Sequence, residues 1–135
     1  MTTMVRSTTA RDGLLRLALR ADAALSAAGG LVFLIAGGGL DSLLGPNAWV
    51  LRLLGVALVG YGAAVWTVAT AATISRRSAS TVIGANLAST VASVVVLIGG
   101  WLPLTTAGVV ATLGMALYTT VFADLQFMGL RRRDR

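Results

Sequence analysis

Three polar residues interrupt the long apolar segments of this chain: Asp22, Asn86 and Asp124. A carboxyl or carboxamide group inside an apolar helix is costly, and it often marks a proton or ion pathway. If folding brings the three together, the cluster could carry protons or a cation. The alternative is structural pairing, in which each carboxylate is held by a nearby arginine such as Arg20 or Arg77.

Other chemistry is excluded by the residue types that are missing. The sequence contains no His, Cys, Lys or Glu, so it offers no ordinary metal ligand set, no Schiff base and no base to activate a serine. The glycine run 37–39 lacks the lysine of a phosphate-binding loop and predicts a flexible helix end instead. We therefore expect no catalytic residue, no metal, no cofactor and no enzyme activity.

The composition indicates a membrane protein. Hydrophobic residues make up 56% of the chain, charged residues only 12%, and the mean hydropathy is +0.84; soluble domains carry about 25% charged residues. The formal net charge of +6 could suggest nucleic acid. The arginines flank apolar segments, however, so the expected partner is a bilayer with anionic headgroups and not nucleic acid.

Charged residues divide the chain into apolar runs. Residues 23–40 and 53–75 each fit one membrane span of about 20 residues. The run 78–123 would form a helix of about 69 Å, more than twice the thickness of the hydrocarbon core, so it must fold back once. The predicted fold is all-α, a single domain (1–135) with four transmembrane helices. The predicted spans are 21–40, 49–74, 79–100 and 104–128.

The segment LIGGWLPLTT, residues 97–106, is where the long run turns. Gly99 and Gly100 accept the positive φ of a helix end, Trp101 suits the membrane interface, and Pro103 can begin a helix but not continue one. A single kinked helix along the surface is the alternative, which the bilayer disfavours.

The distribution of arginine predicts the orientation. Four spans place both termini on one side, together with ten of the eleven arginines, and leave Arg52 alone on the other, near Asp41. This bias predicts a multi-pass protein of the bacterial inner membrane with both termini in the cytoplasm. Lipid headgroups are the expected contacts of seven of these arginines: Arg16, Arg20, Arg76, Arg77, Arg131, Arg132 and Arg133.

The start of the chain is expected to lie at the interface. Residues 1–10 are predicted to be disordered, and the first helix to begin near Asp12. Asp12, Arg16 and Arg20 recur at four-residue spacing and can pair along one helix face.

Small residues also recur at four-residue spacing, which lets helix backbones approach closely. The pattern occurs as Ser26 with Gly30, Gly60 with Ala64, the set Ala85, Ser89 and Ser93, and the set Gly108, Thr112, Ala116 and Thr120. The similarity between the segments LGVAL (54–58) and LGMAL (113–117) raises the hypothesis of a two-hairpin repeat, 12–77 and 78–133. The alternative is a chance match between two apolar segments.

The stretches LRLALRADAALSAAGGLVFLIAGGG, LRLLGVALVGYGAAVW and FADLQFMGLRRR resemble uncharacterised small four-helix inner-membrane proteins of high-GC, actinobacterial-type bacteria. The resemblance covers the whole chain and implies a fold more than an activity. Small multidrug transporters share the length and number of spans, but their hallmark is a membrane-embedded glutamate, and this chain has no Glu.

Two functions remain from the sequence. The first is a non-enzymatic accessory or scaffold protein that acts through helix packing, either as a homo-oligomer or with a partner membrane protein. The alternative is a small oligomeric transporter or channel that uses the Asp22, Asn86 and Asp124 cluster on the cytoplasmic side.

Overall fold

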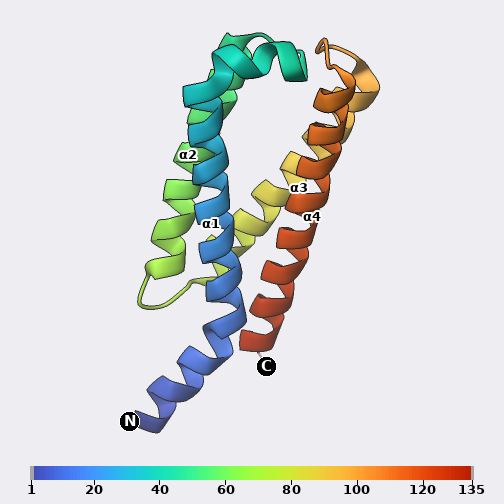
Figure 1. Cartoon of the computed structure of the whole chain (residues 1–135). Helices are drawn as coiled ribbons and strands as arrows, with labels where there is room; N and C mark the ends of the chain where they lie inside the picture. Colours follow the sequence, from blue (N-terminus) through green and yellow to red (C-terminus); the bar gives the residue numbers. More distant parts are fainter. Residues whose placement is uncertain (1, 135) are drawn as a thin grey trace.

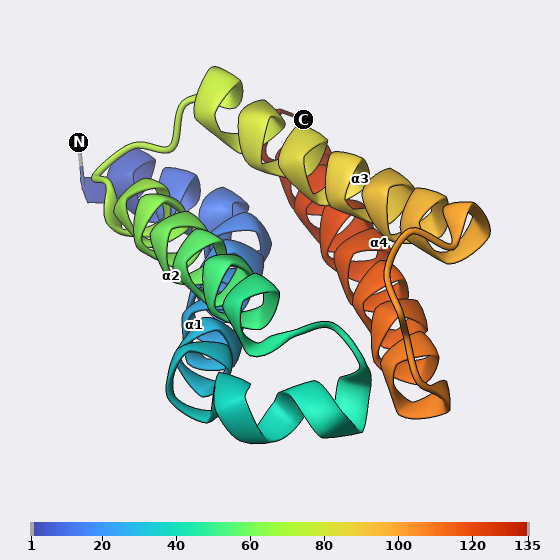
Figure 2. The same cartoon turned by 90° about the horizontal axis from the view of Figure 1, so that it is seen from above.

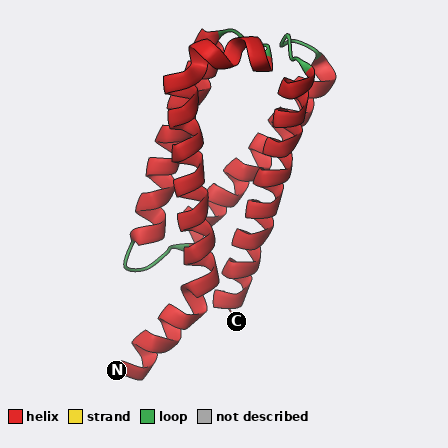
Figure 3. Ribbon diagram, in the orientation of Figure 1, coloured by secondary structure: helices red, strands yellow, loops and turns green. Residues whose placement is uncertain are grey.

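The structure is a computed structural model that describes the backbone of residues 2–134 and the side chains of residues 12–134. Its described part is all-α and contains four helices, shown in Figures 1 and 3. They are α1 (Thr2–Leu44), α2 (Ala48–Thr70), α3 (Arg76–Gly99) and α4 (Thr106–Asp134). Each contains a segment long and apolar enough to cross a membrane, so the prediction of four spans is confirmed at this level.

The observed ends of the helices differ from the predicted ends of the spans. Helix α1 begins at Thr2 and includes residues 2–10, which the sequence analysis expected to be disordered. Helix α2 ends at Thr70, four residues before the expected end of the second span, because Ala71 adopts an extended conformation. Helix α3 starts after Ser75, whose hydroxyl accepts a hydrogen bond from the backbone N–H of Ser78 at 3.0 Å.

The four helices form two hairpins. Figure 2 shows α1 and α2 on one side of the molecule, and α3 and α4 on the other. Helix α1 packs along α2 and also against α4, whereas α2 and α3 barely touch each other. The hairpins are therefore joined along α1 and α4, and the opposite side, between α2 and α3, is left open.

Helices α1 and α2 pack through small residues that bring their backbones into direct contact. A side-chain Cβ at Gly30 would lie 2.7 Å from the carbonyl oxygen of Gly55, and one at Gly55 would lie 2.7 Å from that of Gly30. The prediction for α1 is confirmed at Gly30. For α2 it is wrong, because the surroundings of Gly60 are open and the contact is made by Gly55 and Gly62.

The end of the bundle that carries the GGWLP turn is held by hydrogen bonds. The last turns of α1 bend over toward the start of α4 (Figure 1). There the hydroxyl of Thr105 donates to the carbonyl of Leu43, and its N–H donates to that of Leu44 at 3.1 Å. Helix α3 ends at Gly99, and Gly100 caps it with the predicted positive φ, 65°. Arg52, expected near Asp41, lies against the glycine run of α1 at Gly37.

The opposite end, which we call the arginine-rich end, is held by arginines. Arg16 donates hydrogen bonds to the carbonyls of Ala69 at 2.6 Å and Ala71 at 2.8 Å, at the end of α2. Its guanidinium also lies 3.9 Å from the carboxylate of Asp12, as the four-residue spacing predicted. Arg133, on α4, donates to the carbonyl of Ile74.

Some of the arginines expected to contact lipid headgroups also have partners within the protein. Arg16 and Arg133 are largely withdrawn from solvent and bind backbone carbonyls at the end of α2 and in the α2–α3 connection, and Arg76, whose side chain is 72% exposed, pairs with Asp134. The remaining arginines of that prediction are exposed: Arg20, Arg77, Arg131 and Arg132. Their contact with lipid headgroups stays a prediction.

Candidate functional site

The centre of the site is the carboxylate of Asp22, on α1. Asp22 is completely buried, with 0% of its surface exposed. It lies where α1 meets both α2 and α4. Helix α1 packs against α2 in its own hairpin and against α4 in the other hairpin. The side chain therefore lies at the junction of the two hairpins.

Five side chains donate hydrogen bonds to this carboxylate, and they come from all four helices. Oδ2 accepts from Tyr61 of α2 at 2.8 Å, Asn86 of α3 at 2.9 Å and Gln126 of α4 at 2.8 Å. Oδ1 accepts from Ser26 of α1 at 3.2 Å and Tyr118 of α4 at 3.0 Å. A carboxylate has about four lone-pair sites, so its capacity to accept hydrogen bonds is used up.

The donors are all neutral. They are the amide groups of Asn86 and Gln126 and three hydroxyls, so the site is built to hold a carboxylate by hydrogen bonds alone. Among the described side chains, no arginine lies within 4.0 Å of it. The pairing of Asp22 with Arg20 or Arg77 that the sequence left open is thus replaced by neutral hydrogen bonds.

The structure brings Asp22 and Asn86 together, as predicted, but not Asp124. Asp124 is exposed, and Gln126 occupies the place expected for it. Two residues along a helix correspond to about 200° of rotation, so the two side chains point in nearly opposite directions. The side-chain amide of Asn86 also donates to the side-chain oxygen Oε1 of Gln126 at 3.0 Å, which joins α3 to α4 directly.

Sequence reasoning missed Gln126. In the structure, buried residues of the second half of α4 follow a helical spacing of three to four: Thr119, Ala123, Gln126 and Leu130. The series of small residues seen in the sequence, Gly108, Thr112, Ala116 and Thr120, continues at the same spacing to Asp124 and therefore favoured the wrong residue.

Hydroxyl groups extend the polar network along the interface between α3 and α4. The hydroxyl of Thr90 lies 2.6 Å from that of Thr119 and 3.1 Å from that of Thr120, and it donates to the carbonyl of Asn86 at 3.2 Å. Hydroxyls that bond across helices hold membrane helices together. The described hydrogen bonds between α3 and α4 thus continue about one turn from Asn86 toward the GGWLP end.

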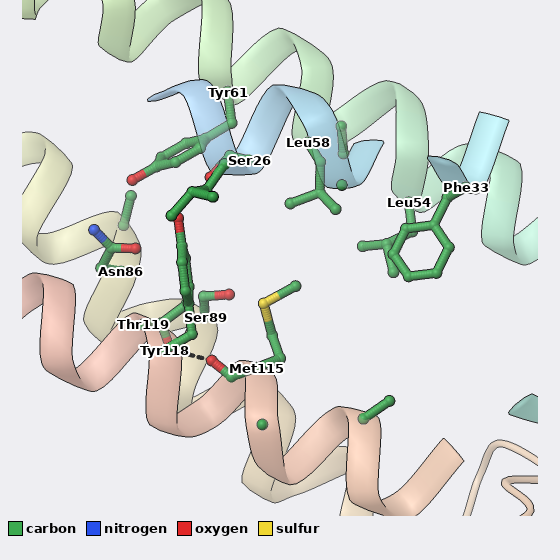
Figure 4. Close-up of a pocket in the computed structure, with 16 residues that line it drawn as sticks. Ser26, Phe33, Leu54, Leu58, Tyr61, Asn86, Ser89, Met115, Tyr118 and Thr119 are labelled. Carbon is green, nitrogen blue, oxygen red and sulfur yellow. Dashed lines mark hydrogen bonds between the residues drawn. The ribbon is translucent and has the colours of Figure 1, made fainter. Parts of the chain in front are cut away.

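A cavity of about 490 Å³ lies beside the cluster, between the hairpins (Figure 4). The rings of Tyr61 and Tyr118 and the side chains of Ser26 and Asn86 form its polar end. A second cavity of about 330 Å³ continues toward the GGWLP turn. The two cavities have six lining residues in common: Phe33, Leu54, Leu58, Ser89, Ala111 and Met115.

No family model, no curated protein and no solved structure matches this chain. The site has therefore to be interpreted from its own geometry.

That geometry sets a buried acid next to an apolar space. Among the described residues there is no cluster of three or more His, Cys, Asp or Glu side chains that could hold a metal ion. Asp22, which lies behind the lining residues of the cavity, accepts five hydrogen bonds within the protein. What the arrangement provides is a fixed negative charge behind two tyrosines, next to an apolar space.

Proposed function

We propose that this chain is a non-enzymatic protein of the bacterial inner membrane that acts as an accessory or scaffold protein through its helix packing. The observation that supports this most directly is the saturation of Asp22 by donors from all four helices. A proton carrier needs a carboxylate that exchanges partners during each cycle, whereas a saturated carboxylate fixes the helices in one arrangement.

A second function, transport by a small oligomeric protein, is favoured by the two adjoining cavities. They extend from the Asp22 cluster toward the GGWLP end and share part of their lining. For this function the polar cluster would consist of Asp22, Asn86 and Gln126.

Proton flux separates the two functions. We expect proteoliposomes that carry a pH gradient and an internal pH-sensitive dye to show no proton flux beyond that of empty liposomes, because Asp22 has no free acceptor site. A protein-dependent flux that disappears in a folded Asp22→Asn variant would contradict the accessory function and favour transport.

The proposed topology places both termini and the α2–α3 connection in the cytoplasm. The charge distribution supports this topology. Ten of the eleven arginines fall in segments that it places on the same side as the termini, and only Arg52 falls on the other side. Fusions of a periplasm-active and a cytoplasm-active reporter should report residue 78 and the C-terminus as cytoplasmic, and residues 44 and 101 as external. A cytoplasmic signal at residue 101 would contradict the four-span topology.

A further inference from the structure

We propose that the cavity beside Asp22 binds an organic cation with an apolar body, which enters from the bilayer between α2 and α3. Three properties of the cavity lead to this ligand: a fixed negative charge, aromatic walls next to that charge, and an otherwise apolar lining. The proposal goes beyond the accessory function, and it holds equally if the protein transports its ligand.

The charge of the cavity is not balanced within the protein. The five donors around Asp22 are neutral, so they stabilise the carboxylate without cancelling its charge. Among the described side chains, the partly buried arginines Arg16 and Arg133 are engaged with carbonyls at the arginine-rich end. The attraction between charges increases as the dielectric constant falls, so the cavity favours a cation over a neutral or anionic guest of the same shape.

The tyrosines explain how a cation could bind without a direct bond to the carboxylate. Tyr61 and Tyr118 both line the cavity (Figure 4). Their hydroxyls both donate to Asp22, which lies behind them. A phenol that donates a hydrogen bond to an anion becomes richer in electrons, and the face of an aromatic ring attracts cations within about 6 Å. The rings therefore transmit the negative charge of Asp22 to the wall of the cavity.

The rest of the lining selects an organic cation over a metal ion. The oxygens of Asp22 are saturated, so they offer no vacant coordination site. Away from the polar end the walls are formed by apolar side chains such as Phe33, Leu54, Leu58 and Met115. The volume of about 490 Å³ lies in the range of small-molecule sites.

Access is provided by the open side of the bundle. Leu25, Leu54 and Ala85 line the cavity and are nevertheless exposed, because α2 and α3 barely touch. In a membrane this opening faces lipid, so a ligand that partitions into the bilayer reaches the site laterally.

The test uses two ions of nearly identical shape and opposite charge. Tetraphenylphosphonium and tetraphenylborate are titrated into the full chain in phosphatidylcholine nanodiscs, with empty nanodiscs as the blank for partitioning and neutral triphenylphosphine oxide as a third probe. We expect saturable binding of the phosphonium and at least about tenfold weaker binding of the other two. Equal affinity for all three, or no saturable binding of the phosphonium, would overturn the proposal.

Two glycine variants locate the binding site. Gly114, on α4, lines the cavity, and a Cβ there would meet no atom within 4 Å; the same open surroundings are found at Gly60 of α2, which lines neither cavity. We expect Gly114→Leu to fill the cavity and weaken phosphonium binding by about tenfold or more, and Gly60→Leu to leave it unchanged. Unchanged binding in Gly114→Leu would place the ligand elsewhere and refute the site.

The role of the charge is tested by Asp22→Asn, which retains the shape of the side chain. In a variant that elutes as the native species and keeps its helical circular dichroism, the preference for phosphonium over borate should disappear. A preserved preference would show that Asp22 is not its source. If the variant does not fold, the comparison of probes and the glycine pair still decide the proposal.

Discussion

Replacing Asp22 with asparagine should lower the free energy of unfolding by about 1.5–3 kcal/mol, the largest effect that we expect from any single substitution of similar size in this chain. Asparagine has one acceptor oxygen in place of two. With its NH2 group in the place of Oδ1, the hydroxyls of Ser26 and Tyr118 must rotate to accept from it, and the three donors at the remaining oxygen lose their charge-assisted hydrogen bonds. Unfolding by sodium dodecyl sulfate in mixed micelles, followed by circular dichroism, measures the change.

Asp124→Asn is the matched control. It is the same chemical change, on a helix of the same bundle, at an exposed residue outside the cluster. We expect its effect to stay within about 0.5 kcal/mol. If both variants lose the same stability, the hydrogen bonds of Asp22 do not hold the four helices together.

Gly55→Ala should be the second most damaging change, although it adds a single methyl group. The new Cβ would lie 2.7 Å from the carbonyl oxygen of Gly30 and 3.0 Å from the backbone N of Leu34, so α1 and α2 would have to separate. Backbone atoms cannot rotate away as a side chain does, and overpacking of this kind costs about 1–3 kcal/mol.

Gly60→Ala, five residues along the same helix, is the control for Gly55→Ala. A Cβ at Gly60 would meet no atom within 4 Å. Because alanine favours the helix over glycine, we expect unchanged or higher stability, by up to about 1 kcal/mol. The two substitutions thus have opposite expected signs. Equal destabilisation by both would indicate that glycine is needed for flexibility of α2 and not for the contact with α1.

The number of helices and the position of the third turn could be predicted from the sequence because they follow from length and backbone chemistry. A charge-free run of that length cannot cross a bilayer once, and Gly100 takes the positive φ that ends α3. The ends of the helices were less predictable. Arg16 and Arg133 bind carbonyls at the end of α2 and in the α2–α3 connection. These contacts join different helices, so they could not be predicted by considering each span separately.

The candidate site was only partly predictable, because the rotation of a membrane helix about its axis is weakly encoded. Faces toward lipid and faces toward protein are both apolar, so the pattern that orients a soluble helix is faint here. Asp22 and Asn86 stood out by residue type alone. Gln126, Tyr61 and Tyr118 could be assigned only when the helices were placed against one another.

Thr105 has a consequence for how the GGWLP end crosses the membrane during biogenesis. Its N–H and hydroxyl donate to the final carbonyls of α1, and the same hydroxyl accepts from the N–H of Gly108 in the first turn of α4. The negative end of one helix dipole therefore meets the positive end of another. The two partial charges offset each other through one uncharged side chain, without the acidic and basic residues that often cap such ends. In the proposed topology this end is translocated, and a connection that carries no full charge lowers the electrostatic barrier to its passage through the hydrocarbon core.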